Sequence, residues 1–393
     1  MIKKILIILI ALFLTKHFIY AQKTSDFCGV TGAIASASYG AGGYRLPSTG
    51  TIDMLLVFAE FPDDQYDTTN TRWVKGQQPQ NMNNWIDNSW SSNPTQGSLT
   101  HYFNEMSDEK LKITGKEIHI VAPHTRHEYF NLYSSNKRGN IHRELLQQID
   151  LTEDFARYDN WEYVKNYTHN ERNDTFVDMV IIIWRNVFND TLGYKSDLGF
   201  LYSYGDLGYG ADIPVDGGLR FIDPNTLRSG ATVNGYLGTD PFKVTIHEFA
   251  HYLLGYNSMH NGFGFWGMLS DWGTKSYVAN SFERAQLQWM DNTDFCTLDA
   301  SAGSAPDTTL NLTDYITNNQ AIKVIVDTTD DKYFYIENHQ NLSYWETHAP
   351  FSDHPNSTDG LVENGIYVIR QHSFSNGSNI MEMSKSLIPA DGR

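Results

Sequence analysis

The chain has 393 residues, of which 40% are hydrophobic, enough for one large globular domain or two ordinary ones. Its formal net charge is −17 at pH 7, with acidic residues spread along the chain, which argues against nucleic acid or an anionic membrane surface as the main partner. The same acidity leaves carboxylates available for Ca²⁺, although no EF-hand loop identifies the ligands.

The N-terminus has the pattern of a signal peptide. Lys3 and Lys4 precede a short apolar run, Ile5 to Leu14, and Ala21 offers a small residue for cleavage. The sequence therefore predicts a signal peptide over residues 1–21 and a secreted protein, with an uncleaved anchor as the alternative. The run is too short for a comfortable membrane span, so we expect no span after cleavage.

Weak periodicity marks residues 22–50 as a loose leader or linker, rich in Gly, Ser, Ala and Thr. We expect order to begin with an apolar strand over 52–61. Ser98 then opens a helix, because apolar residues from Leu99 onward recur at helical spacing. Residues 112–121 follow as a strand or hairpin.

Further along the chain, we expect a helix around 142–149 and a buried strand over 177–184, which is too continuously apolar to be an edge strand. A short strand over 232–237 precedes the most informative segment, described below. A helix around 281–290 follows that segment.

From Cys296 onward the pattern changes to alternating, strand-like segments, which predicts a β-rich C-terminal region over 294–393. We place the domain boundary near residue 294, so that the first domain covers 51–293. The clearest of these strands are 321–327, 333–337 and 365–370.

One amphipathic helix carries the chemistry. Proline at its first position, Pro241, favours a helix start, and Gly255 provides a stop. Within it, His247 and His251 stand one turn apart, so both imidazoles project from one face. Two neutral imidazoles at that spacing can hold one Zn²⁺, and Glu248 can take a proton from the water that the zinc activates.

A zinc peptidase needs a third protein ligand and an open fourth position. We select His260, because the chain after Gly255 can fold back under the metal. Asp271 is an alternative ligand. Glu283 is another, since some zinc peptidases take a glutamate from a later helix.

Further segments resemble one known group of enzymes, in the same order along the chain. With the zinc helix, they make the chain similar to the immune-inhibitor-A-type metallopeptidases, within the wider metzincin group. The resemblance spans roughly residues 51 to 290, and a further similar segment lies at 333–338. Its segments are 55–63, 98–103 with 111–115, 177–184, the zinc helix, 267–270 and, more weakly, 281–289.

The resemblance implies an α+β fold with a twisted mixed sheet over the active-site helix, polypeptide substrates, and a methionine turn beneath the metal at Met268. The sequence also departs from the metzincin pattern. Metzincins place glycine three residues after the second histidine and the third ligand three residues beyond that glycine. Here that distance from Gly255 ends on Ser258, which has no side chain suited to zinc, and His260 lies two residues further.

Three functional hypotheses follow. The first is a secreted zinc endopeptidase with His247, His251 and His260 as metal ligands and Glu248 as general base. The second is a secreted binding or adhesion protein with a structural or silent zinc site. The third is a zinc hydrolase of the glutamate-ligand class, in which Glu283 is the third metal ligand. The intact Glu248 favours an enzyme, because a structural site has no use for a base.

The two cysteines also leave two interpretations open. In an oxidising compartment, a disulfide between Cys28 and Cys296 is expected. Alternatively, Cys28 lies near the mature N-terminus and could cap the zinc as an inhibitory thiolate.

Overall fold

The computed structural model forms two compact units: one contains the described residues from 43 to 255, the other those from 267 to 388. Each unit mixes helices and strands, in agreement with the predicted α+β class. The structure describes residues 43–64, 73–89, 94–185, 197–200, 203–234, 241–255, 267–269, 278–291, 293–301, 309–328, 332–348, 364–375 and 381–388.

A four-stranded parallel sheet organises the first unit. Its strands lie in the order β2-β1-β5-β8. Every residue of β5 is buried, and β5 pairs on both sides, which confirms the prediction of an interior strand. The strand bounds are β1 Gly50–Glu60, β2 Leu111–Val121, β5 Val180–Trp184 and β8 Gly230–Asn234.

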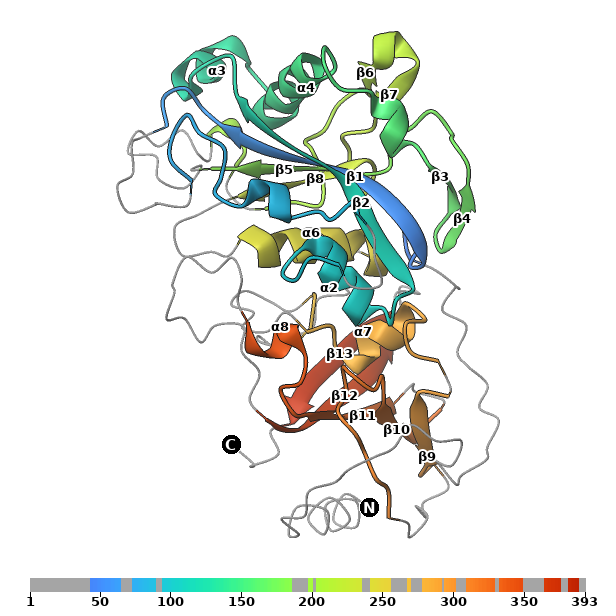
Figure 1. The fold of residues 1–393 in the computed structure, drawn as a ribbon. Coiled ribbons are helices and arrows are strands. Elements are labelled where there is room, and N and C mark those ends of the chain that lie inside the picture. The colour runs from blue at the N-terminus through green and yellow to red at the C-terminus, as the bar shows by residue number, and fades with distance from the viewer. Residues whose placement is uncertain are drawn as a thin grey trace. The chain divides into compact units, whose positions relative to one another are not determined.

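Helices cover both faces of this sheet, because the side chains of its strands alternate between the faces. From β1, Leu55 and Val57 join an apolar cluster with α4 on one face. Phe58 points to the other, where its ring lies 5.1 Å from that of Trp85. Figure 1 shows α3 and α4 on one side of the sheet and α2 and α6 on the other. Their bounds are α2 Leu99–Met106, α3 Arg126–Leu132, α4 Lys137–Ile149 and α6 Pro241–Leu254.

Local capping explains where two of these helices begin. The side chain of Ser98 accepts a hydrogen bond from the backbone N–H of His101, which confirms the predicted start of α2. Thr125 and Glu128 form a reciprocal capping box at the start of α3. The predicted helix around 142–149 is confirmed, but it starts earlier, at Lys137.

The remaining elements of the first unit are short. They are η1 Met82–Asn84, η2 Phe155–Tyr158, β3 Trp161–Lys165 paired with β4 Thr168–Glu171, and β6 Ile213–Val215 paired with β7 Arg220–Ile222 across η3 Asp216–Gly218.

The end of the region predicted as a loose leader is ordered. The backbone N–H groups of Tyr44 and Arg45 donate to the carbonyl oxygens of Leu253 and Tyr252, at 2.7 Å each. These carbonyls lie in the last turn of α6, where a helix has no internal donors for them. The prediction for residues 43–50 was therefore wrong, because acceptors at the end of a distant helix impose order that local composition does not reveal.

A five-stranded sheet organises the second unit, in the order β13-β12-β11-β10-β9. The strands predicted at 321–327, 333–337 and 365–370 are confirmed as β10, β11 and β12. The bounds are β9 Phe295–Asp299, β10 Ala321–Asp327, β11 Lys332–His339, β12 Gly365–Ser375 and β13 Met381–Ile388, with helices α7 Ser281–Gln286 and α8 Tyr344–Thr347.

The domain boundary near residue 294 remains a prediction, and compactness divides the described chain earlier, before residue 267. The contact of α7 with β11 explains the earlier division, since Glu337 accepts the backbone N–H of Ser281 at 2.6 Å. Cys296 is buried in β9, whereas Cys28 and the predicted signal peptide lie outside the described residues, so both the disulfide and the signal peptide stay predictions. Over the described chain, none of the helices has the length and apolar character needed to cross a membrane.

Candidate metal centre

Helix α6 starts at Pro241 and ends at Leu254, as the sequence predicts. Its apolar stripe is buried: the ring of Phe249 lies 4.9 Å from that of Phe103 on α2, and Phe242 lies 5.1 Å from Trp85. Gly255 follows with φ +119°, a conformation that side-chain-bearing residues rarely adopt. The helix is therefore held by its apolar face, and its other side carries the polar motif.

The structure brings the two predicted histidine ligands together. The rings of His247 and His251 lie with their centroids 5.0 Å apart and their planes at 87°. The Nδ1 atom of His251 lies 2.8 Å from the carbonyl oxygen of Gly255. A carbonyl oxygen only accepts, so Nδ1 carries the proton, and Nε2 is the nitrogen with the lone pair. A histidine that binds a metal through Nε2 commonly donates its Nδ1–H to a carbonyl oxygen in this way.

Glu248 lies between these histidines in sequence and is only 6% exposed. Burial, followed by the negative charge of Asp206, raises its pKa to about 8, against the opposing effect of Arg138. A cation bound at the neighbouring histidines would favour the ionised carboxylate, because an opposite charge lowers the pKa of an acid. A cation bound there would therefore change the protonation of this carboxyl group.

The segment 203–208 forms a wall beside the motif. Tyr204 pairs with Thr232 of β8 in an antiparallel bridge. A methyl group added at the next residue, Gly205, would lie 3.9 Å from both Glu248 Oε2 and His251 Cβ. The hydroxyl of Tyr252 donates to the carbonyl oxygens of Gly205 and Gly230, which ties α6 to this wall.

Charged and polar groups behind this wall were missed by the sequence analysis. Asp206 forms an ion pair with Arg138 of α4, and both are buried. His142 Nδ1 contacts the carbonyl oxygen of Leu207 at 2.7 Å, and its Nε2 accepts from Trp184 at 2.9 Å. The Tyr- and Gly-rich sequence around residue 205 has no periodicity that could have predicted these contacts.

Of the candidates for the third ligand, His260 and Asp271 lie outside the described residues. Glu283 is buried in α7, where its carboxylate accepts backbone N–H groups from Met268 at 2.8 Å, Leu269 at 3.0 Å and Asn280 at 3.0 Å. Both of its oxygens are therefore used in holding the 267–269 turn. Within the described part of the chain, no group of three or more His, Cys, Asp or Glu side chains could hold a metal ion.

Comparison of the chain with protein-family models and with curated proteins finds no match.

Proposed function

We propose that this protein is a secreted zinc-dependent endopeptidase with a metzincin-like fold. His247, His251 and His260 bind the zinc ion, and Glu248 is the general base. The observation that carries the proposal is the contact of His251 Nδ1 with the Gly255 carbonyl, which places the lone pair of the ring on Nε2, together with the 5.0 Å between the ring centroids of His251 and His247. That pair fits a zinc ion, because neutral imidazole nitrogens with a fixed tautomer are its preferred ligands.

The metzincin-like assignment rests on the resemblance described above. It is supported by a sheet with α6 on one face; the four strands are parallel rather than mixed, and the antiparallel pairing among the described residues of this sheet is a single bridge between Tyr204 and Thr232 of β8. The polypeptide substrate class also rests on the resemblance. Met268 is buried in the 267–269 turn, as a packing role requires. Secretion remains part of the proposal on the strength of the N-terminal pattern.

Zinc, when bound, supplies Lewis-acid activation of water and of the amide carbonyl. Glu248 accepts a proton from the attacking water and passes it to the leaving amine, so that it serves first as base and then as acid. Its burial beside the wall formed by Gly205 excludes bulk water from this proton. A methyl group at Gly205 would lie at ordinary contact distance from Glu248 Oε2, 3.9 Å away, so glycine at this position leaves space beside the carboxyl group.

His260 is preferred to Glu283 as the third ligand, because the carboxylate of Glu283 already accepts three backbone N–H groups. Moving it to a metal would leave buried donors unpaired. We therefore expect His260→Ala to lower the zinc content, and Glu283→Gln to leave the zinc content unchanged while lowering stability.

The test measures zinc content and casein hydrolysis of the mature chain and of Glu248→Gln, with Glu105→Gln on α2 as a matched control. We expect one zinc per chain in all three proteins. Hydrolysis should fall about 10²- to 10⁴-fold in Glu248→Gln only, the range for loss of a general base. Zinc without hydrolysis in any protein would favour the binding-protein alternative, and a folded protein without zinc would refute the metal site.

A further inference from the structure

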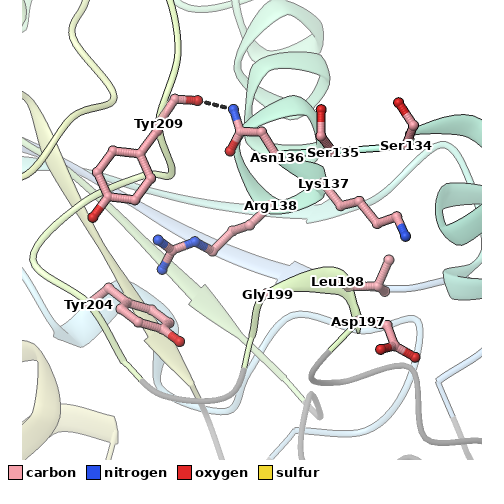
Figure 2. A pocket seen from close by; sticks show the side chains of 10 residues that line it. All are labelled: Ser134, Ser135, Asn136, Lys137, Arg138, Asp197, Leu198, Gly199, Tyr204 and Tyr209. Atoms are coloured by element: carbon pink, nitrogen blue, oxygen red, sulfur yellow. Dashed lines mark hydrogen bonds between the residues drawn. The ribbon is translucent and has the colours of Figure 1, made fainter.

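A cavity of about 380 Å³ lies beside the N-terminus of α4, within the first unit. Figure 2 shows Asn136, Lys137 and Arg138 of the helix start facing Gly199 and Tyr204, with Tyr209 above. No role has been given to this cavity so far. The hydrogen-bond donors that line the cavity indicate which kind of ligand it could bind.

The start of α4 offers backbone donors to the cavity. Asn136 has φ 44°, and its side chain does not cap the helix. Its amide donates instead to the carbonyl oxygen of Tyr209. The backbone N–H groups of Lys137 and Arg138 therefore find no hydrogen-bond partner among the described residues. An uncapped helix start with its positive dipole end attracts anions.

The side chain of Arg138 supplies an independent indication of a ligand. It is only 7% exposed, and its guanidinium carbon lies 3.8 Å from the ring centroid of Tyr204. One terminal nitrogen, Nη2, is paired with Asp206, while the other, Nη1, is buried and has no hydrogen-bond partner in the part of the chain that the structure describes. A buried charged donor without an acceptor is costly, so an acceptor from outside the chain would stabilise it.

We propose that this cavity binds a small oxyanion, a carboxylate or phosphate group, between the N-terminus of α4 and Nη1 of Arg138. Lys137 lines the same cavity and adds a positive charge at its edge, where its ammonium nitrogen lies 4.1 Å from the ring centroid of Phe130. Asp197 also lines it, and Asp206 offsets part of the charge of Arg138. Binding therefore depends on directed N–H donors more than on net charge, which favours a compact anion of low charge.

The cavity is lined by other residues than the proposed metal centre, although the charges of Asp206 and Arg138 both change the pKa of Glu248. Gly205 is directed toward Glu248 and His251, whereas its neighbour Asp206 pairs with Arg138. The anion site therefore stands whether or not the protein is a peptidase.

Isothermal titration calorimetry of the mature chain tests the proposal, with sodium phosphate and sodium acetate titrated separately at constant ionic strength. The variants are Lys137→Gln and Arg138→Lys, and the charge-matched control is Lys165→Gln on the β3–β4 hairpin. Thermal denaturation of each protein shows that it is folded. Lys137→Gln is the safer variant, because it leaves the pair between Arg138 and Asp206 intact.

We expect saturable binding of at least one anion, weakened about fivefold in Lys137→Gln and about tenfold in Arg138→Lys, and unchanged in the control. Binding of phosphate alone, of acetate alone or of both identifies the group that the cavity accepts. The proposal is overturned if neither anion binds at millimolar concentration. It is equally overturned if all four proteins bind alike, since the anion then lies elsewhere, for example on the zinc.

Discussion

The carbonyl oxygen of Gly255 accepts a hydrogen bond from Nδ1 of His251 across 2.8 Å, one turn along the chain. Gly255 therefore does two things at once: it ends α6 and fixes the tautomer of a proposed zinc ligand. Both depend on its backbone conformation, with φ +119°. A substitution at this glycine should accordingly change metal binding without touching a ligand.

Gly255→Ala is expected to weaken zinc binding about 10- to 100-fold, the usual effect of disturbing a group that orients a ligand. Competition with a chromophoric chelator measures this affinity. Gly217→Ala is the matched control, because Gly217 also has positive φ but has open space around it. Both variants should lose about 1–3 kcal/mol of stability from backbone strain. Equal zinc affinity in the two would contradict the orienting role of Gly255.

Substitutions at Gly205 should affect catalysis in proportion to their size. A methyl group there would lie at ordinary contact distance from Glu248 and His251, and 3.0 Å from a carbon of the Leu227 side chain, which can shift. We expect Gly205→Ala to retain most of the casein hydrolysis and Gly205→Val to lose more than tenfold, since its added carbons intrude on the carboxylate. Zinc content should stay constant. Similar activity in both variants would show that the wall does not border the reacting groups.

His142 should make the first unit sensitive to acid. Burial, and then the charge of Arg138, lowers its pKa to about 3, and its two ring nitrogens donate to Leu207 and accept from Trp184. Below about pH 6.5 the unfolded chain binds a proton that the folded chain does not. The free energy of unfolding should fall by about 1.4 kcal/mol per pH unit as the pH drops from about 6 toward 3.

Denaturant unfolding at several pH values measures this slope, and His142→Asn should remove it. The variant is expected to be less stable at pH 7, because Trp184 loses its acceptor. An unchanged acid slope in the variant would assign the sensitivity to another group.

His339 should make the stability of the second unit depend on pH in the opposite direction. It lies fully buried between two carboxylates, with Nδ1 2.6 Å from Glu346 and Nε2 3.1 Å from Glu337. Burial alone lowers its pKa, but the two carboxylates outweigh burial and raise it above the ordinary value. The stability that the protonated ring contributes is therefore present below about pH 6.5 and is lost as the pH rises through the raised pKa.

Unfolding monitored between pH 5 and 9 measures this loss, with His348→Gln as a control at an exposed histidine of the same unit. His339→Gln should be less stable at pH 6 and should lack the alkaline decline. A decline that persists in His339→Gln would mean that a different group releases the proton.

The local pattern of apolar and polar residues predicted much of the fold and the helical part of the proposed site. Apolar spacing located β5 and α6, and the four-residue separation of His247 and His251 placed both on one face of a helix. The same reasoning failed at residues 43–50, because their order comes from hydrogen bonds to the last turn of α6. It also could not identify Arg138 or Asp206, which lie 68 residues apart in the chain.

The sequence alone determined which residues are proposed for the metal chemistry, since a helix repeats every 3.6 residues and fixes which side chains share a face. Only the tertiary structure decided what surrounds them: the wall at Gly205 against Glu248, and the pairing of Arg138 with Asp206 behind it. The reason is physical. Contacts between distant segments depend on how β8, α4 and α6 pack together, and such packing leaves no period in the local sequence.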